Sequence, residues 1–203
     1  MNHRQIPNAL SIARLVMTLM VLVSLDLADR YQQDAAIWVA LVLFVLAALT
    51  DALDGYLARR WKAISQFGRI VDPLADKLLI LGTAGYLAAL DHYETGVAAW
   101  ILATLLLREL LVTGLRGVVE SSGGDFSARW SGKLKMILQS VALPIAILGM
   151  ALDPAAENPS GFFLLRDGLL IGMAAATLIS GWPYVRGAAV MLRQQEDPVG
   201  SGR

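Results

Sequence analysis

Long apolar segments separated by short polar ones run along almost the whole chain. A helix needs about 20 mostly apolar residues to cross a bilayer. Stretches of about that length lie roughly at residues 10–28, 35–57, 71–90, 97–119, 134–152 and 162–186. The pattern predicts an all-α integral membrane protein, with six transmembrane helices in a single domain that covers residues 1–203.

The segments that connect these stretches alternate in charge. Lys and Arg gather at both termini and in the second and fourth connections, whereas Asp and Glu gather in the first, third and fifth. The positive-inside rule places the basic connections in the cytoplasm. Both termini are then cytoplasmic, as an even number of spans requires.

The first ten residues, MNHRQIPNAL, precede the first apolar run. They are expected to form a short interfacial helix that begins near Pro7 and Asn8, or else a frayed terminus. Arg4 before an apolar run is also a feature of signal peptides. Because no small-residue cleavage site follows residue 20, we expect the first run to be retained.

Composition agrees with a membrane protein and narrows the possible chemistry. Hydrophobic residues make up 56% of the 203, and the mean hydropathy of +0.57 is too high for an ordinary soluble domain. The 17 Lys+Arg balance the 17 Asp+Glu, so net charge indicates no class of partner. The chain has no cysteine, which excludes disulfides and thiol chemistry, and only two histidines, His3 and His92, which excludes a multi-histidine metal centre.

Four aspartates interrupt this apolar sequence. Asp51 and Asp54 lie about one turn apart at the end of the second stretch, and Asp72 and Asp76 lie about one turn apart at the start of the third. We expect two antiparallel helices to bring the four carboxylates together near the cytoplasmic interface. Charges at membrane depth are costly and usually mark function. The alternative is that headgroup water solvates them.

Carboxylates this close repel each other, and some would be protonated unless a cation joined them. Hard divalent cations such as Mg²⁺ prefer oxygen ligands, often together with substrate phosphates. Four aspartates can hold two such ions, the arrangement that clamps a phosphoryl group during displacement. The sequence therefore predicts a two-metal site.

Small residues lie on the same helix faces as the aspartates. Gly55, Ala58 and Gly68 leave room either for a ligand or for a closely packed helix, and both interpretations stay open. Arg59 adjoins them, and a guanidinium can bind a phosphate through two hydrogen bonds.

The full pattern reads Asp51-x-x-Asp54-Gly55-x-x-Ala58-Arg59-(eight)-Gly68-x-x-x-Asp72-x-x-x-Asp76. It resembles the signature of the CDP-alcohol phosphotransferase family in every fixed position. The resemblance implies a six-helix membrane enzyme, usually a homodimer, that uses two divalent cations, Mg²⁺ or Mn²⁺. Such an enzyme transfers a phosphatidyl group from a CDP-linked lipid to an alcohol and releases CMP.

Further segments are similar to the branch of the family whose acceptor is sn-glycerol 3-phosphate. They are Asn8 to Arg14 with Ser11 between, DPLADK at 72–77, Arg108-Glu109, Leu115-Arg116, and Gly132-Lys133-Leu-Lys135. The branch often has Thr where this chain has Met136. The resemblance covers about residues 5–150. It implies CDP-diacylglycerol as donor, a role in phospholipid biosynthesis and a place in the bacterial inner membrane, with the active site cytoplasmic.

The resemblance also assigns roles. Asp51, Asp54, Asp72 and Asp76 would bind the metals, and Asp76 would take the proton of the acceptor hydroxyl. The residues for the CDP moiety would be Asp54, Gly55, Ala58, Arg59 and Gly68. The dianionic acceptor needs cations, and the candidates are Arg108, Arg116, Lys133 and Lys135.

Two features of these cations leave alternatives open. Arg116 shares a helix face with Glu109, seven residues earlier, so the two can instead form an ion pair. Lys133 and Lys135 point about 200° apart on a helix, so only one is expected to face the site.

Other functions remain to be distinguished. Within the same class, the acceptor can be serine, inositol phosphate or phosphatidylglycerol. From other classes, a divalent-cation transporter would need its carboxylates nearer the bilayer midplane, and a structural scaffold leaves the aspartates unexplained. Nothing in the sequence indicates nucleic acid as a partner.

Overall fold

Every regular element within the described part of the chain is a helix. The computed structural model describes residues 5–61, 66–90, 92–121, 130–152 and 160–196. Side chains are described for residues 9–51, 71–90, 92–117, 132–152 and 161–189. The all-α prediction is confirmed for these residues.

Long and short helices follow one another along the chain. They are α1 (Gln5–Tyr31), α2 (Asp34–Trp61), α3 (Gln66–Lys77), the π-helix η1 (Leu78–Gly82), α4 (Thr83–Ala89), α5 (Ala99–Ser121), α6 (Trp130–Ala151) and α7 (Ser160–Glu196). The backbone is helical at both ends of η1, so α3, η1 and α4 form one continuous segment. Within α3, Pro73 lacks the N–H that an interior helical residue donates.

Within the described residues, four helices are long and apolar enough to cross a membrane: their spans are Ala9–Tyr31, Asp34–Asp51, Gly132–Ala151 and Gly161–Ala189. The α3–α4 segment and α5 are also helical, but their sequences are less apolar. The first contains Asp72 and Asp76, and the second contains Arg108 and Glu109. The expected interfacial helix is part of α1, which is continuous from Gln5. The structure thus supports a multi-pass membrane protein.

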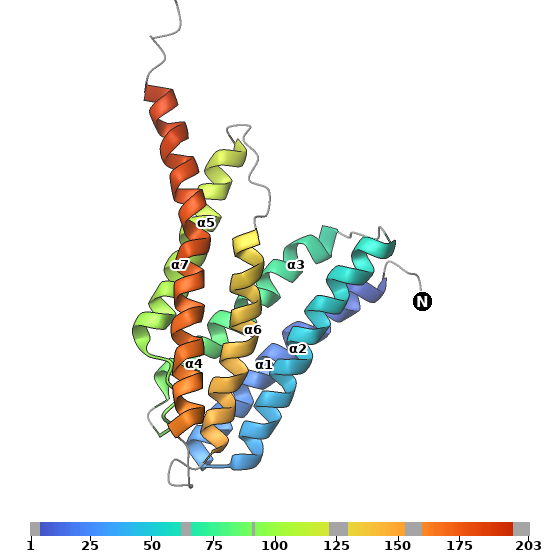
Figure 1. Ribbon diagram of the computed structural model, residues 1–203. Helices are drawn as coiled ribbons and strands as arrows, with labels where there is room; N and C mark the ends of the chain where they lie inside the picture. The colour runs from blue at the N-terminus through green and yellow to red at the C-terminus, as the bar shows by residue number, and fades with distance from the viewer. Residues whose placement is uncertain (1–4, 62–65, 91, 122–129, 153–159, 197–203) are drawn as a thin grey trace, which may run out of the picture.

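The helices run alternately up and down (Figure 1). The C-terminal ends of α2 and α5 and the N-terminal ends of α3 and α6 lie at one end of the bundle, at the top of Figure 1. In the interior, α6 packs against α2 and α7, and α1 packs against α2 and α3. Large side chains such as Phe44, Leu143 and Ile147 are fully buried there.

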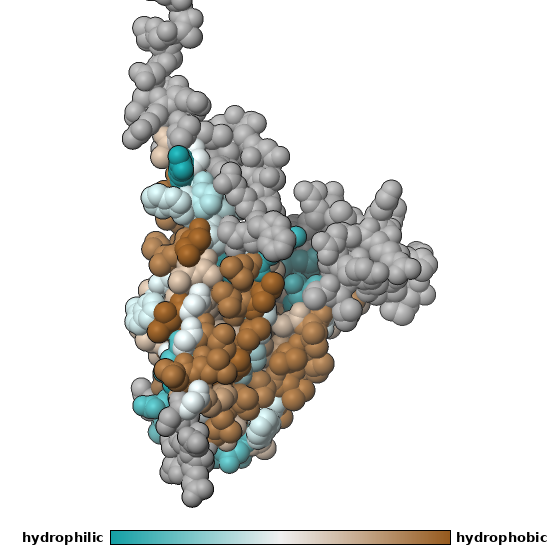
Figure 2. Space-filling model, viewed as in Figure 1, coloured by the Kyte–Doolittle hydropathy of each residue, from teal (hydrophilic) through white to brown (hydrophobic). Residues whose placement is uncertain are grey.

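The outer surface is strongly apolar. Figure 2 shows hydrophobic residues over the middle of the molecule, with hydrophilic residues toward its lower end. Large side chains that point outward include Leu49, Leu110, Leu164 and Ile179. A continuous apolar surface of this kind marks a protein that contacts lipid.

The lower end of the bundle is held by polar contacts. Tyr86 of α4 donates a hydrogen bond of 2.6 Å to Asp26 of α1. His92 lies 2.9 Å from Asp29, and the hydroxyl of Tyr93 donates to the carbonyl of Ala28. These contacts fix α1 against the segment that leads from α4 to α5.

Candidate active site

The first helix carries a buried polar stripe. Ser11, Arg14 and Thr18 follow each other at helical spacing, and all three are buried. Thr18 donates a hydrogen bond of 2.9 Å to the carbonyl of Arg14, so the stripe is tied to its own backbone. Because α1 packs against both α2 and α3, this stripe faces the two helices that carry the aspartates.

Two polar side chains of α1 contact two of the aspartates. The Arg14 guanidinium lies 2.6 Å from Oδ1 of Asp51 on α2, and Ser11 donates a hydrogen bond to Oδ1 of Asp72 on α3. Ser11 and Arg14 are one helical turn apart. Asp51 of α2 and Asp72 of α3 therefore lie on the same side of α1.

Asp76, the third aspartate of the pattern whose side chain is described, lies one turn after Asp72 on α3. Asp51, Glu109 and Lys135 are near enough to act on it electrostatically. It also lines a small polar cavity of about 10 Å³, together with Lys77, Ile80, Leu81, Glu109, Lys135 and Gln139. Such a volume holds about one water molecule. The π-helix η1 begins directly after this part of α3, and single π turns are frequent beside functional sites.

Ionic contacts close this cavity on the side of α5 and α6. Lys135 is paired with Oε1 of Glu109, and Arg108 donates to the same oxygen over 2.9 Å. Lys77 donates a hydrogen bond of 2.9 Å to Thr113 of α5. The neighbourhood of Asp76 is thus a network of charged and hydroxyl groups from three helices.

A larger groove lies between α2 and α6, with a volume of about 680 Å³. Its apolar lining comprises Val45, Ala48, Leu49, Met136, Ile137 and Val141. Its polar lining is Asp51, Lys133 and Ser140. The two helices are antiparallel, so Asp51 and Lys133 lie at the same end of the groove (Figure 1).

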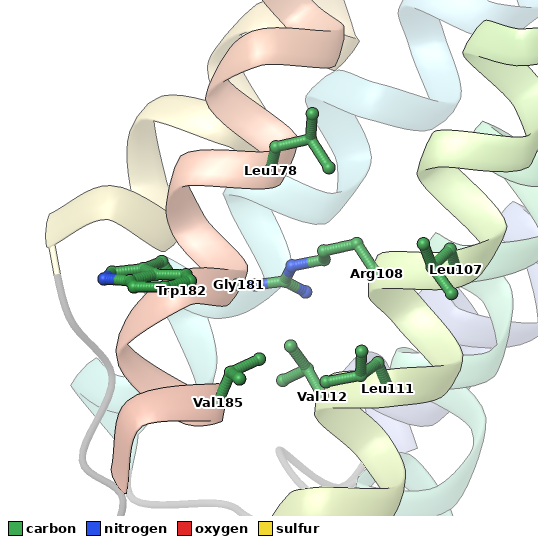
Figure 3. Close-up of a pocket in the computed structure, with 8 residues that line it drawn as sticks. All are labelled: Leu107, Arg108, Leu111, Val112, Leu178, Gly181, Trp182 and Val185. Atoms are coloured by element: carbon green, nitrogen blue, oxygen red, sulfur yellow. The ribbon is translucent and has the colours of Figure 1, made fainter. Parts of the chain in front are cut away.

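The four basic residues expected at the acceptor site do not all face one place. Lys135 lines the cavity of Asp76, whereas Lys133 lines the groove of Asp51. Arg108 points toward α7, where its Nε donates to Ser180 over 3.1 Å, and it lines an apolar groove between α5 and α7 (Figure 3). Arg116 is exposed on α5. Their binding roles stay predictions.

The remaining predicted residues lie on the expected helices. Asp54, Gly55, Ala58 and Arg59 belong to α2, and Gly68 belongs to α3. Their side chains are outside the described ones, so their contacts are not part of the geometry above.

The structure adds contacts at the site that the sequence did not predict. Ser11 and Arg14 contact the aspartates, and Glu109 organises Lys135 and Arg108. A sequence signal existed for Arg14, since a charge inside an apolar span is costly and needs a partner. The spacing of Ser11, Arg14 and Thr18 along one face was a second signal.

The chemistry of the carboxylates fits a divalent cation. Asp51, Asp72 and Asp76 offer only oxygen ligands, which Mg²⁺ and Mn²⁺ prefer. Among the described side chains, no group of three or more acidic residues or histidines is already arranged to hold a metal ion. Asp54, the fourth member of the pattern, is not among those side chains.

Comparisons with known proteins agree with this chemistry. A family model described as CDP-alcohol phosphatidyltransferase matches residues 4–182. A protein of Cereibacter sphaeroides, named CDP-diacylglycerol–glycerol-3-phosphate 3-phosphatidyltransferase, is 32% identical over 94% of this chain and 98% of its own length. A Bacillus subtilis protein of the same name is 30% identical over 88% of this chain and 92% of its own. A Mycobacterium tuberculosis protein, named probable phosphatidylglycerophosphate synthase, is 35% identical over 88% of this chain and 78% of its own length.

Proposed function

This chain belongs to the CDP-alcohol phosphatidyltransferase family, and we propose that it transfers the phosphatidyl group of CDP-diacylglycerol to sn-glycerol 3-phosphate. The products are phosphatidylglycerophosphate and CMP. The observation that carries this proposal is that relatives named for this activity match the chain over nearly its full length. The eight fixed residues of the family pattern supply the matching chemistry.

The reaction displaces CMP at a phosphorus atom. An acceptor hydroxyl oxygen forms a bond to the phosphorus of the phosphatidyl group, and the bond from that phosphorus to the bridging oxygen of the pyrophosphate breaks. We propose that Asp51, Asp54, Asp72 and Asp76 hold two divalent cations, Mg²⁺ or Mn²⁺. When bound, these ions neutralise the pyrophosphate and stabilise CMP as it leaves.

Asp76 is the residue we propose as the acceptor of the hydroxyl proton. It lines the same cavity as Lys77 and Lys135, so its carboxylate is beside cations that attract an anionic acceptor. A carboxylate is a weak base, and its contribution depends on its position at the hydroxyl. Asp54, Gly55, Ala58, Arg59 and Gly68 are the residues proposed to bind the cytidine and its phosphates.

The groove between α2 and α6 suits the lipid donor. Its lining is mostly apolar, and its polar end holds Asp51 and Lys133. A molecule with two acyl chains and a pyrophosphate likewise has a long apolar part and a polar end. We propose that the acyl chains lie along the groove and that the pyrophosphate lies at the polar end.

The acceptor would be bound by basic residues on α5 and α6. Lys135 is the first candidate, since among the four basic residues proposed for the acceptor only Lys135 lines the cavity of Asp76. Lys133, Arg108 and Arg116 complete the proposed set. Because the cavity holds only about one water molecule, a phosphate reaches Lys135 only if Lys135 or Glu109 moves.

The proposed setting is the bacterial inner membrane. We propose six spans, with the α3–α4 segment and α5 completing the four apolar helices, and with both termini and the active site in the cytoplasm. The basic connections at the end of the bundle that carries Asp51 and Asp72 support this orientation. We propose that residues 1–203 form a single domain and that the protein is a homodimer. The homodimer is proposed from the family resemblance alone.

The test is a detergent assay of the purified protein with CDP-diacylglycerol, Mg²⁺ and radiolabelled sn-glycerol 3-phosphate. Serine, inositol phosphate and phosphatidylglycerol serve as parallel acceptors. Metal-dependent label in an acidic lipid, matched by CMP release, is the expected result. CMP release with only another acceptor would contradict the acceptor but keep the reaction class, and no CMP with any acceptor would contradict both.

A further inference from the structure

Arg14 is an unusual residue for a membrane-spanning helix. Its side chain is fully buried, and no charged side chain in the described part of the chain is less exposed. A buried guanidinium needs an anion within contact distance, because removing a charge from water is costly. The carboxylate of Asp51 supplies that anion at 2.6 Å.

Asp51 therefore has one observed and one proposed cationic partner. In this structure its Oδ1 contacts Arg14, and the proposed function makes it a ligand of a divalent cation. We propose that Arg14 is the permanent counter-cation of the metal site: it neutralises Asp51 before the metal binds, and its charge weakens metal binding. This inference rests on the proposed metal-binding role of Asp51.

The physical argument has two parts. Without metal, several carboxylates share one end of the bundle, and a resident positive charge offsets their repulsion. With metal, a divalent cation that approaches Asp51, whose side chain is 35% exposed, is repelled by the buried charge of Arg14, which solvent and salt screen only weakly. Arg14 thus lowers the affinity for metal, and in return it stabilises the site when no metal is bound.

Lys133 provides a matched comparison. It carries the same charge and lines the same groove as Asp51, but it is exposed, whereas Arg14 is buried. Solvent and salt screen an exposed charge much more than a buried one. Removing the charge of Lys133 should therefore change metal binding far less than removing that of Arg14.

The experiment is a titration of the full-length protein in detergent with Mn²⁺, in which free Mn²⁺ is measured by electron paramagnetic resonance. Arg14→Gln is expected to bind Mn²⁺ at least about tenfold more tightly than the wild type. Arg14→Lys, which keeps the charge, should stay within about threefold of the wild type, and so should Lys133→Gln.

The outcomes separate this inference from the proposed function. If the wild type shows no saturable Mn²⁺ binding, the metal site fails and this inference fails with it. If the wild type binds Mn²⁺ but Arg14→Gln binds equally or more weakly, only the role of Arg14 is overturned. Equal tightening in Arg14→Gln and Lys133→Gln would also overturn it, because the effect would then reflect net charge rather than the buried pair.

Thermal unfolding in EDTA gives a second measurement, which does not depend on metal binding. Asp51→Asn leaves the guanidinium of Arg14 buried without its anion, so it should lower Tm strongly. The double variant Arg14→Gln/Asp51→Asn should be more stable than the sum of the two single losses predicts. Simple additivity would contradict the pair as a coupled unit.

Discussion

One oxygen of Glu109 contacts two cations that face different helices. Lys135 of α6 is paired with Oε1 of Glu109, and Arg108 donates to the same oxygen over 2.9 Å. On the Lys135 side lies the cavity of Asp76. On the other side, Arg108 reaches Ser180 of α7. Glu109 therefore binds one cation that lies at the candidate site and another that lies at the interface with α7.

This division predicts that the two cations differ in their effect on the acceptor. Lys135→Met should raise the KM for sn-glycerol 3-phosphate at least about tenfold, because a phosphate loses a partly buried charged contact. The KM for CDP-diacylglycerol should change less than about twofold. Arg108→Met, which removes the other partner of Glu109, should have the smaller effect on the acceptor KM. Initial rates with each substrate varied in turn measure both constants.

A larger effect of Arg108→Met than of Lys135→Met would reverse this assignment and place the acceptor toward α7. Equal changes in both KM values would mean that Lys135 acts on the fold rather than on one substrate. Thermal unfolding of both variants provides the control, since each removes one of the two Glu109 contacts described above.

Asp76→Asn should separate binding from chemistry. The amide keeps the size of the carboxylate and one oxygen ligand, but it cannot take a proton. Turnover should therefore fall at least about a hundredfold, which is typical for the loss of a general base. Binding of CDP, measured by isothermal titration calorimetry with Mg²⁺ present, should persist. Unchanged turnover would remove Asp76 from the proton transfer.

The groove between α2 and α6 predicts a chain-length effect. Ile137→Trp adds bulk to the groove and should raise the KM for a donor with long acyl chains more than for one with eight-carbon chains. Ile179→Trp is the matched control, because Ile137 and Ile179 are 60% and 67% exposed but only Ile137 lines this groove. The ratio of kcat/KM for the two donors is measured in each variant. The same change of ratio in both would mean that the acyl chains lie elsewhere.

Much of the fold follows from the hydrophobic pattern alone. The runs that begin near residues 10, 35, 134 and 162 are long helices in the structure, because an apolar stretch of this length satisfies its backbone only as a helix in a membrane. The apolar stretches also put Asp51 and Asp54 on one helix and Asp72 and Asp76 on the next, and these residues belong to α2 and α3. The π-helix η1 has no comparable signal, since its geometry depends on how α3 and α4 pack.

The partners of the site residues were harder to predict. Whether Lys133 or Lys135 faces the carboxylates depends on how α6 is rotated about its axis, and the structure turns each lysine toward a different acidic residue. The contact between Arg14 and Asp51 joins residues 37 positions apart on neighbouring helices. Periodicity gives the face of a helix, but only tertiary packing gives the residue opposite.

The end of the bundle away from the aspartates contains a glycine that its surroundings require. Gly96 has a φ of +75°, and a Cβ at this position would lie 2.7 Å from both Nε of Arg166 and Oδ1 of Asp167. Arg166 is itself held by three groups: it pairs with Asp167, donates to the carbonyl of Glu94 and lies 4.7 Å from the ring of Phe163. A side chain at residue 96 would therefore push against the guanidinium of Arg166, which is buried and held by these contacts.

Gly96→Ala should destabilise the protein by at least about 1–2 kcal/mol, since the left-handed backbone and the contact with Arg166 both oppose a methyl group. Gly172→Ala on α7 is the matched control, because no atom outside its own helix turn lies within 4 Å of the added Cβ. Alanine is the better helix former, so Tm should not fall there. Thermal unfolding in one detergent compares the two. A Tm for Gly96→Ala equal to that of Gly172→Ala would mean that Arg166 does not fix the segment between α4 and α5.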